Sequence, residues 1–147
     1  MKAHASRTPH AWMLAALTVL FAGRVAGQAV QRFAPQPFLP DFHAFQGSTI
    51  AYGPLLTMQA LILAAMARTT LKVRQRRLRP GPAATRAIRV AGRLYLAQAL
   101  ARIAVGVLLP QAASWFTTWI PAIFHVVPAL FVVVLADHLR SLRSETS

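Results

Sequence analysis

Four apolar segments of about 20 residues follow one another along the chain, and polar or turn-forming stretches separate them. The segments run over about residues 11–31, 50–67, 88–109 and 118–136. A helix needs about 20 residues to cross a hydrocarbon layer of about 30 Å. Because lipid does not tolerate unpaired backbone groups, each segment is predicted to be helical. The pattern therefore predicts an all-α integral membrane protein with four transmembrane helices in an up-down bundle.

The basic residues give these helices a direction across the membrane. Thirteen of the 16 Lys and Arg residues fall within residues 1–10, residues 68–93 and the tail after Asp137. The loops at residues 33–49 and 110–118 contain none. Because basic loops stay in the cytoplasm, we expect residues 68–87 to form a basic cytoplasmic loop and both termini to be cytoplasmic. The expected location is the inner membrane of a bacterial cell. The loop at 33–49, rich in aromatic residues and proline, is then periplasmic.

The first segment also has a second interpretation. Lys2, Arg7, the apolar run and the small residues at 25–27 together resemble a cleavable signal peptide, which would remove residues 1–27. Against cleavage, Arg24, Gln28 and Arg32 recur at i, i+4 and i+8, which places them on one helical face. We favour a retained helix on this spacing.

Composition excludes several classes of chemistry. The chain has no cysteine, and its only acidic residues are Asp41, Asp137 and Glu145, so thiolate chemistry and a carboxylate metal cage are not supported. It contains no Walker loop, HExxH or CxxC motif, and Ser48 and Ser114 lie in loops without a nucleophile-elbow motif. No residue set argues for an enzyme, and no metal site is predicted.

Six polar residues are predicted to meet in the periplasmic half of the helices. A charge at the centre of a span costs about 2.5–3.5 kcal/mol, so such residues face the interior of a bundle. At a rise of 1.5 Å per residue, Arg24 and Arg102 reach nearly the same level in the membrane, about 20 Å from the cytoplasmic edge. Tyr95 shares a helical face with Gln98 and Arg102, which follow it at i+3 and i+7. The six are Arg24, Gln28, Gln59, Gln98, Arg102 and His125, and the loop above them adds Asp41 and His43.

Two interpretations of this polar cluster remain open. In the structural one, Asp41 neutralises one arginine, the other extends outward, and His125 satisfies a neighbouring polar group. In the functional one, two arginines against one carboxylate leave positive charge for an anionic or polar ligand. A haem held by His43 and His125, a quinone, or a metal held by Asp41, His43 and His125 are further alternatives, although no spacing fixes them. No cofactor is predicted.

The basic loop has a simpler interpretation. Five cations lie within eight positions: Lys72, Arg74, Arg76, Arg77 and Arg79. They set the topology and are predicted to contact anionic phospholipids or an acidic cytoplasmic partner. Nucleic acid is not expected as a partner, because no aromatic residue is interleaved for stacking. At the end of the fourth segment, Asp137 and His138 are expected to pair with Arg140 or with this loop.

Taken together, these features predict a small multi-pass inner-membrane protein that acts as a non-enzymatic binding or accessory subunit. The lipid bilayer and a larger membrane complex are its expected partners. The alternatives are a homo-oligomeric transporter or channel and a redox protein that binds haem or quinone.

Overall fold

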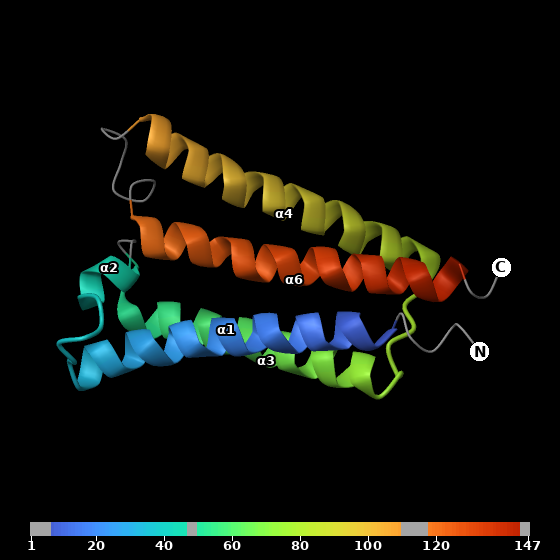
Figure 1. The fold of residues 1–147 in the computed structure, drawn as a ribbon, viewed down its shortest axis with the longest axis horizontal. Coiled ribbons are helices and arrows are strands. Elements are labelled where there is room, and N and C mark those ends of the chain that lie inside the picture. Colours follow the sequence, from blue (N-terminus) through green and yellow to red (C-terminus); the bar gives the residue numbers. More distant parts are fainter. Residues whose placement is uncertain (1–6, 47–49, 110–117, 145–147) are drawn as a thin grey trace.

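The computed structural model describes residues 7–46, 50–109 and 118–144, and all the regular secondary structure in these ranges is helical. Its helices are α1 (Arg7–Phe33), α2 (Phe42–Gln46), α3 (Tyr52–Arg74), α4 (Pro82–Leu108) and α6 (Trp119–Ser144) (Figure 1). Four of them, α1, α3, α4 and α6, are long and apolar enough to cross a membrane. The predicted helical class and the number of membrane-length helices are therefore confirmed. Ser48, Ser114, Glu145 and most of the second predicted periplasmic loop lie outside the described residues.

The helices extend further than the apolar segments at the basic end of the molecule. Within the predicted cytoplasmic loop at 68–87, residues up to Arg74 continue α3 and α4 already begins at Pro82, so the non-helical link is only 75–81. Hydrophobicity marks only the length that fits into lipid, whereas Leu, Lys and Arg remain good helix formers beyond it. Helix α3 ends at Arg74, and α4 begins at Pro82, where proline is tolerated in the first turn.

The turn between α3 and α4 is short and ordered by backbone hydrogen bonds. Arg77 N donates to Lys72 O over 2.9 Å and Arg76 N to Val73 O over 3.0 Å, the pattern of a Schellman motif. Arg76 takes the left-handed conformation that this motif requires, with φ of 56°. The ends of α3 and α4 thereby stay close in sequence, and all four long helices have one end at this basic end of the molecule (Figure 1).

Packing runs in one order through the molecule: α3 lies against α1, α1 against α6, and α6 against α4. The apolar core fills the space among α1, α3 and α6 with Leu14, Phe21, Val25, Met66, Phe131 and Leu135. In the described chain, α3 and α4 do not form a packed pair. Helices α3 and α4 therefore lie at the two ends of the packing order, with α1 and α6 between them.

Small residues let α4 approach α6 closely. The buried positions Thr85, Gly92, Ala99 and Gly106 recur every seven residues along α4. At Gly92 the contact is tightest, since a Cβ atom there would lie 3.0 Å from Val132 Cγ1 and 3.3 Å from the Val132 carbonyl carbon. Small residues at such a crossing permit the van der Waals contact that holds helices together in lipid.

The predicted periplasmic loop at 33–49 carries the short helix α2, which packs against α1 and α6. Phe42 and Phe45 are three residues apart and so share one side of this single turn. Phe45 is buried, and its ring lies 3.8 Å from the position of a Cβ on Gly27. The loop therefore folds back over α1 at the end opposite the basic end.

Candidate functional site

A stripe of buried polar residues on α1 forms the first part of the site. Arg24, Gln28 and Gln31 are buried, with Gln28 fully so at 0% exposure. Arg32, which the i, i+4, i+8 spacing placed on the same face, is instead exposed and stacks over Phe33 and Phe42 at 5.9 and 5.8 Å. With 3.6 residues per turn, i+7 returns almost to the starting face, whereas i+8 is well past it. The stripe thus continues through Gln31.

Hydrogen bonds link this stripe to α3 and to the loop. The Arg24 guanidinium donates from Nη1 to Gln28 Oε1 over 2.7 Å and from Nη2 to Phe45 O over 2.8 Å. Gln59 on α3 donates from Nε2 to the same Gln28 oxygen over 3.1 Å. One glutamine oxygen therefore joins α1 and α3, and the backbone of α2 helps to fix the direction of the arginine.

A second polar group comes from α4 and α6. The Tyr95 hydroxyl and His125 Nδ1 are 3.3 Å apart, and their rings meet edge-on. Arg102 lies two turns along α4 from Tyr95 and is only 2% exposed. Ala99 and Gly106, on the same side of α4, leave room for these larger side chains against α6.

A cavity of about 200 Å³ separates the two polar groups. Side chains from α1, α3, α4 and α6 line it, and Gln46 of α2 borders it. Its polar lining residues are Gln46, Arg24, Gln59, Tyr95, Arg102 and His125. Apolar side chains form most of the remaining wall, among them Phe21, Leu55, Met58, Ile62, Phe124 and Pro128. The cavity therefore presents a polar patch within an apolar enclosure, which is typical of sites for small molecules.

The charge of this lining is positive. Arg24 and Arg102 contribute two guanidinium groups. Neither acidic residue in the described part of the chain, Asp41 or Asp137, is among the lining residues. Arginine stays protonated in proteins, so the positive charge is permanent. An anion or a strong hydrogen-bond acceptor is the chemical partner that this arrangement favours.

Several buried polar atoms at the cavity have unused hydrogen-bonding capacity. Arg24 Nε, Gln28 Nε2 and Gln59 Oε1 are buried and have no hydrogen-bond partner among the described residues. Buried polar atoms are almost always paired with protein, water or ligand. Arg24 and Gln59 both line the cavity, so a donor and an acceptor are available to a molecule inside it.

The structure brings together five of the eight predicted site residues and separates the other three. Arg24, Gln59, Arg102 and His125 line the cavity, and Gln28 supports two of them. Gln98 is exposed, because it lies one helical step away from the buried Ala99, beyond the edge of the stripe that faces α6. It is therefore outside the predicted cluster.

Asp41 and His43 also lie outside the predicted polar cluster. Both are exposed, since the single turn of α2 directs its phenylalanines inward and these residues outward. The expected neutralisation of an arginine by Asp41 is wrong for Arg24, whose guanidinium is bound by Gln28 and the Phe45 carbonyl. His43 is exposed on α2 and does not line the cavity, whereas His125 does, so a haem or metal held by both stays a hypothesis. The described residues contain no group of three His, Cys, Asp or Glu that could hold a metal ion.

Sequence reasoning missed three contributors to the site: Gln31, Phe45 and Gln46. Gln31 Oε1 accepts from Gln36 N over 2.9 Å and so fixes the chain leaving α1. The i+7 spacing from Arg24 would have identified this residue. Phe45 acts through its backbone carbonyl, which carries no signal in the sequence.

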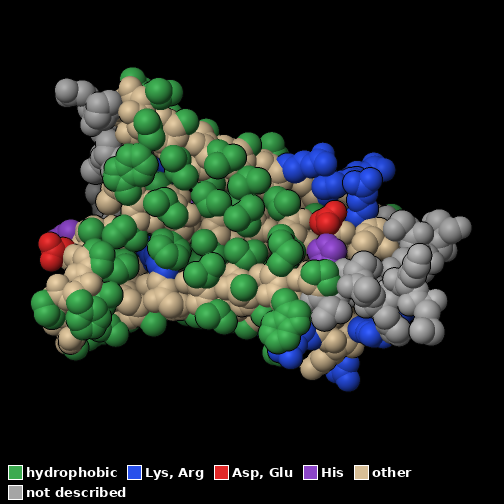
Figure 2. Space-filling model, in the orientation of Figure 1, with side chains coloured by type: hydrophobic (Ala, Val, Ile, Leu, Met, Phe, Trp, Pro, Cys, Tyr) green, Lys and Arg blue, Asp and Glu red, His purple; other side chains and the backbone are tan. Residues whose placement is uncertain are grey.

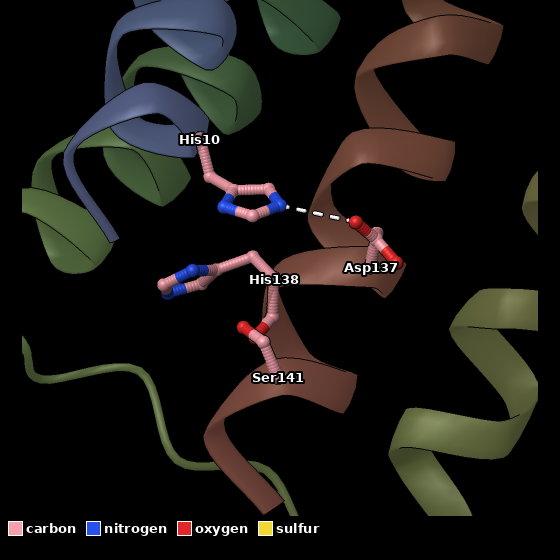
Figure 3. Close-up of polar contacts among 4 residues, drawn as sticks. All are labelled: His10, Asp137, His138 and Ser141. Atoms are coloured by element: carbon pink, nitrogen blue, oxygen red, sulfur yellow. Dashed lines mark hydrogen bonds and ion pairs between the residues drawn. The ribbon is translucent and has the colours of Figure 1, made fainter. Parts of the chain in front are cut away.

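A separate polar cluster fastens α1 to α6 at the basic end (Figure 3). His10 Nε2 and Asp137 Oδ2 are 3.1 Å apart. The His10 and His138 rings lie 5.6 Å from each other, and Ser141 Oγ donates to His138 O over 2.8 Å. Asp137 therefore bonds to α1, whereas the sequence suggested Arg140 or the basic loop. The sequence distance between residues 10 and 137 hides this contact.

The five cations predicted to contact anionic lipid are all exposed. Lys72 and Arg74 lie on the last turn of α3, and Arg76, Arg77 and Arg79 lie in the turn that follows. Arg74 also stacks over Trp12 of α1 at 5.8 Å. Their exposure is compatible with the predicted contact, which stays a prediction.

Comparison with family models, with curated proteins and with solved structures gave no match for this chain. The function is therefore argued from the site.

Proposed function

We propose that this chain is a small protein of the bacterial inner membrane that holds an anionic or polar ligand within its helices. Four helices cross the membrane as an up-down bundle, α1 is retained, and both termini lie in the cytoplasm. The positions of the basic residues support this orientation. The cavity then lies in the periplasmic half, and the protein acts as a non-enzymatic binding or accessory subunit.

The observation that carries the proposal is the pair of buried arginines in the cavity lining. Arg24 and Arg102 come from different helices, and no carboxylate of the described chain shares the lining with them. Each buried arginine costs free energy in a membrane, so such residues are retained where they face a partner or a ligand. An anionic group between them would offset part of that cost through charge-assisted hydrogen bonds.

The walls of the cavity add a preference for a ligand with an apolar part. Phe21, Met58, Ile62 and Phe124 surround the polar patch. In addition, α3 and α4 both line the cavity without forming a packed pair. A molecule that carries a polar head and an apolar body matches these surroundings better than a small hydrophilic ion does.

A quinone is the second candidate, and the Tyr95–His125 pair favours it. A phenol and an imidazole 3.3 Å apart beside an apolar cavity could bind a quinone carbonyl and relay a proton to it. An ultraviolet spectrum of the organic extract of the purified protein tests this candidate. A quinone absorbance that is lost in Tyr95→Phe and His125→Gln would support it over the anionic ligand.

The direct test of the binding proposal is native mass spectrometry of protein released from mild detergent. We expect wild type to retain an adduct that Arg102→Gln and Arg24→Gln each lose. Arg32→Gln removes the same charge from an exposed position on the same helix as Arg24, so it should keep the adduct. Thermal unfolding of all variants checks that they are folded. Equal retention by Arg102→Gln and wild type would mean that the cavity is not the binding site.

A further inference from the structure

A second cavity lies at the basic end, between α4 and α6. It has a volume of about 90 Å³ and is lined by Arg89 and Arg93 of α4 and by Val133, Ala136, Asp137 and Arg140 of α6. Arg89 and Arg93 are one helical turn apart and so project from the same side of α4. This cavity is separate from the one described above and shares no lining residue with it.

The charge of this cavity is positive and only partly balanced. Three guanidinium groups surround a single carboxylate, and that carboxylate also bonds to His10 on the α1 side over 3.1 Å. No ion pair joins Arg89, Arg93 or Arg140 to a carboxylate within the described part of the chain. All three arginines are exposed, and basic side chains gather over this part of α4 (Figure 2).

The position of the cavity along the helices points to a lipid ligand. Arg93 is the last charged residue of α4 before the uncharged stretch 94–101, and Asp137 is the first charged residue after the apolar run of α6. Val133, one turn further into the apolar part of α6, and the exposed Leu94 stand on the apolar side of the arginines. The cavity therefore lies at the boundary where a membrane changes from acyl chains to phosphate groups.

We propose that this cavity binds the phosphate group of an anionic phospholipid, with its acyl chains along the groove between α4 and α6. Arginine matches phosphate with paired hydrogen bonds, and basic pockets between transmembrane helices hold such head groups. The site differs from the exposed cations of the basic turn at 72–79 in that Val133 and Ala136 of α6 line the cavity beside the arginines.

Native mass spectrometry in mild detergent with added lipid tests the proposal. Wild type is incubated with phosphatidylglycerol or with phosphatidylcholine, and the bound lipid per chain is measured. We expect preferential retention of phosphatidylglycerol. The triple variant Arg89→Gln/Arg93→Gln/Arg140→Gln should lower its apparent affinity about tenfold or more, because three cations at the phosphate level are removed.

The matched control is Arg76→Gln/Arg77→Gln/Arg79→Gln, which removes the same charge from the turn after α3. It should lower the affinity for phosphatidylglycerol much less than the cavity variant does. Equal losses in the two triple variants would overturn the proposal, since the binding would then follow the overall charge. Equal binding of phosphatidylcholine, or displacement of the lipid by millimolar inorganic phosphate, would also overturn it.

A variant that is expected to bind more lipid separates a loss of binding from a loss of folding. Asp137→Asn removes the carboxylate that competes with the phosphate and should raise retention of phosphatidylglycerol. His10→Gln breaks the same His10–Asp137 contact and leaves the carboxylate in place, so it should not raise retention. Weaker binding in Asp137→Asn than in His10→Gln would contradict the proposal.

Discussion

Gln28 is the residue on which the polar side of α1 depends. Its fully buried side-chain oxygen accepts from both Arg24 Nη1 and Gln59 Nε2. Loss of this acceptor would leave two buried donors without it, and a buried unsatisfied group costs about 1–3 kcal/mol. In membranes the unfolded reference state also finds partners, which reduces such values.

We therefore expect Gln28→Leu to lower the free energy of unfolding by about 1–3 kcal/mol. Reversible unfolding in mixed micelles with increasing sodium dodecyl sulfate measures this change. Gln98→Leu is the matched control, because Gln98 has the same chemistry but is exposed on α4. Its effect should be within about 0.5 kcal/mol. Equal destabilisation by the two substitutions would mean that the Gln28 contacts do not hold α1 and α3 together.

At this scale, the sequence predicts which side chains are costly in lipid but not what they contact. The depths of Arg24 and Arg102 follow from counting residues along a helix, and both indeed line one cavity. The partners of Arg24 could not be predicted, because one is a backbone carbonyl in a loop. Asp41 and His43 were misplaced for the same reason: loop conformation decides which way they face, and no periodicity describes it.

At the scale of elements, the crossing of α4 and α6 is the contact most sensitive to side-chain size. A Cβ atom at Gly92 would lie 3.0 Å from a Val132 side-chain atom and 3.3 Å from Val132 and Val133 backbone atoms. The seven-residue recurrence of small residues along α4 can be read in the sequence, but the helix that they meet cannot.

Gly92→Leu should therefore push α4 away from α6 and destabilise the protein by about 1–3 kcal/mol. Gly23→Leu provides the control, because Gly23 lies within α1 and nothing lies within 4 Å of the position of its Cβ. That substitution should be neutral or slightly stabilising, since leucine is a better helix former than glycine. Thermal unfolding in detergent compares the two. A lower melting temperature for Gly23→Leu than for Gly92→Leu would rule out a tight α4–α6 crossing.

The ends of the elements show the limit of hydropathy as a guide. The apolar segments predict where four helices lie, whereas their extension toward Arg74, Pro82 and Ser144 depends on helix propensity and stop signals. The short turn after α3 brings basic residues onto ordered helical turns. This placement matters for function, since it positions Arg89 and Arg93 beside α6.

At the scale of the whole molecule, the two ends differ in chemistry (Figure 2). The basic end carries most of the arginines and the contact between His10 and Asp137, and on the face shown apolar side chains predominate over the long middle part. The opposite end carries α2 and the larger cavity. The proposed orientation gives each end a separate role, with lipid phosphate at the cytoplasmic face and a ligand in the periplasmic half.

The order in which helices pack also affects access to the cavity. Helices α1 and α6 lie at the centre of the packing order, and α3 and α4 lie at its two ends. The larger cavity is lined by residues of all four, so it borders both outer helices, α3 and α4. The sequence predicts four helices and their alternation, but the packing order depends on side-chain shape across helices. It could not be predicted from hydropathy alone.

The most direct test of the proposed orientation is cysteine labelling in intact cells. The natural chain has no cysteine, so each introduced cysteine is a unique target. Ala34→Cys, just after α1, and Gln75→Cys, just after α3, place exposed targets at opposite ends of the molecule. A membrane-impermeant maleimide should label Ala34→Cys in cells with a permeable outer membrane and label Gln75→Cys only after the inner membrane is opened. Labelling of Gln75→Cys in intact cells would contradict the orientation and remove the periplasmic position of the cavity.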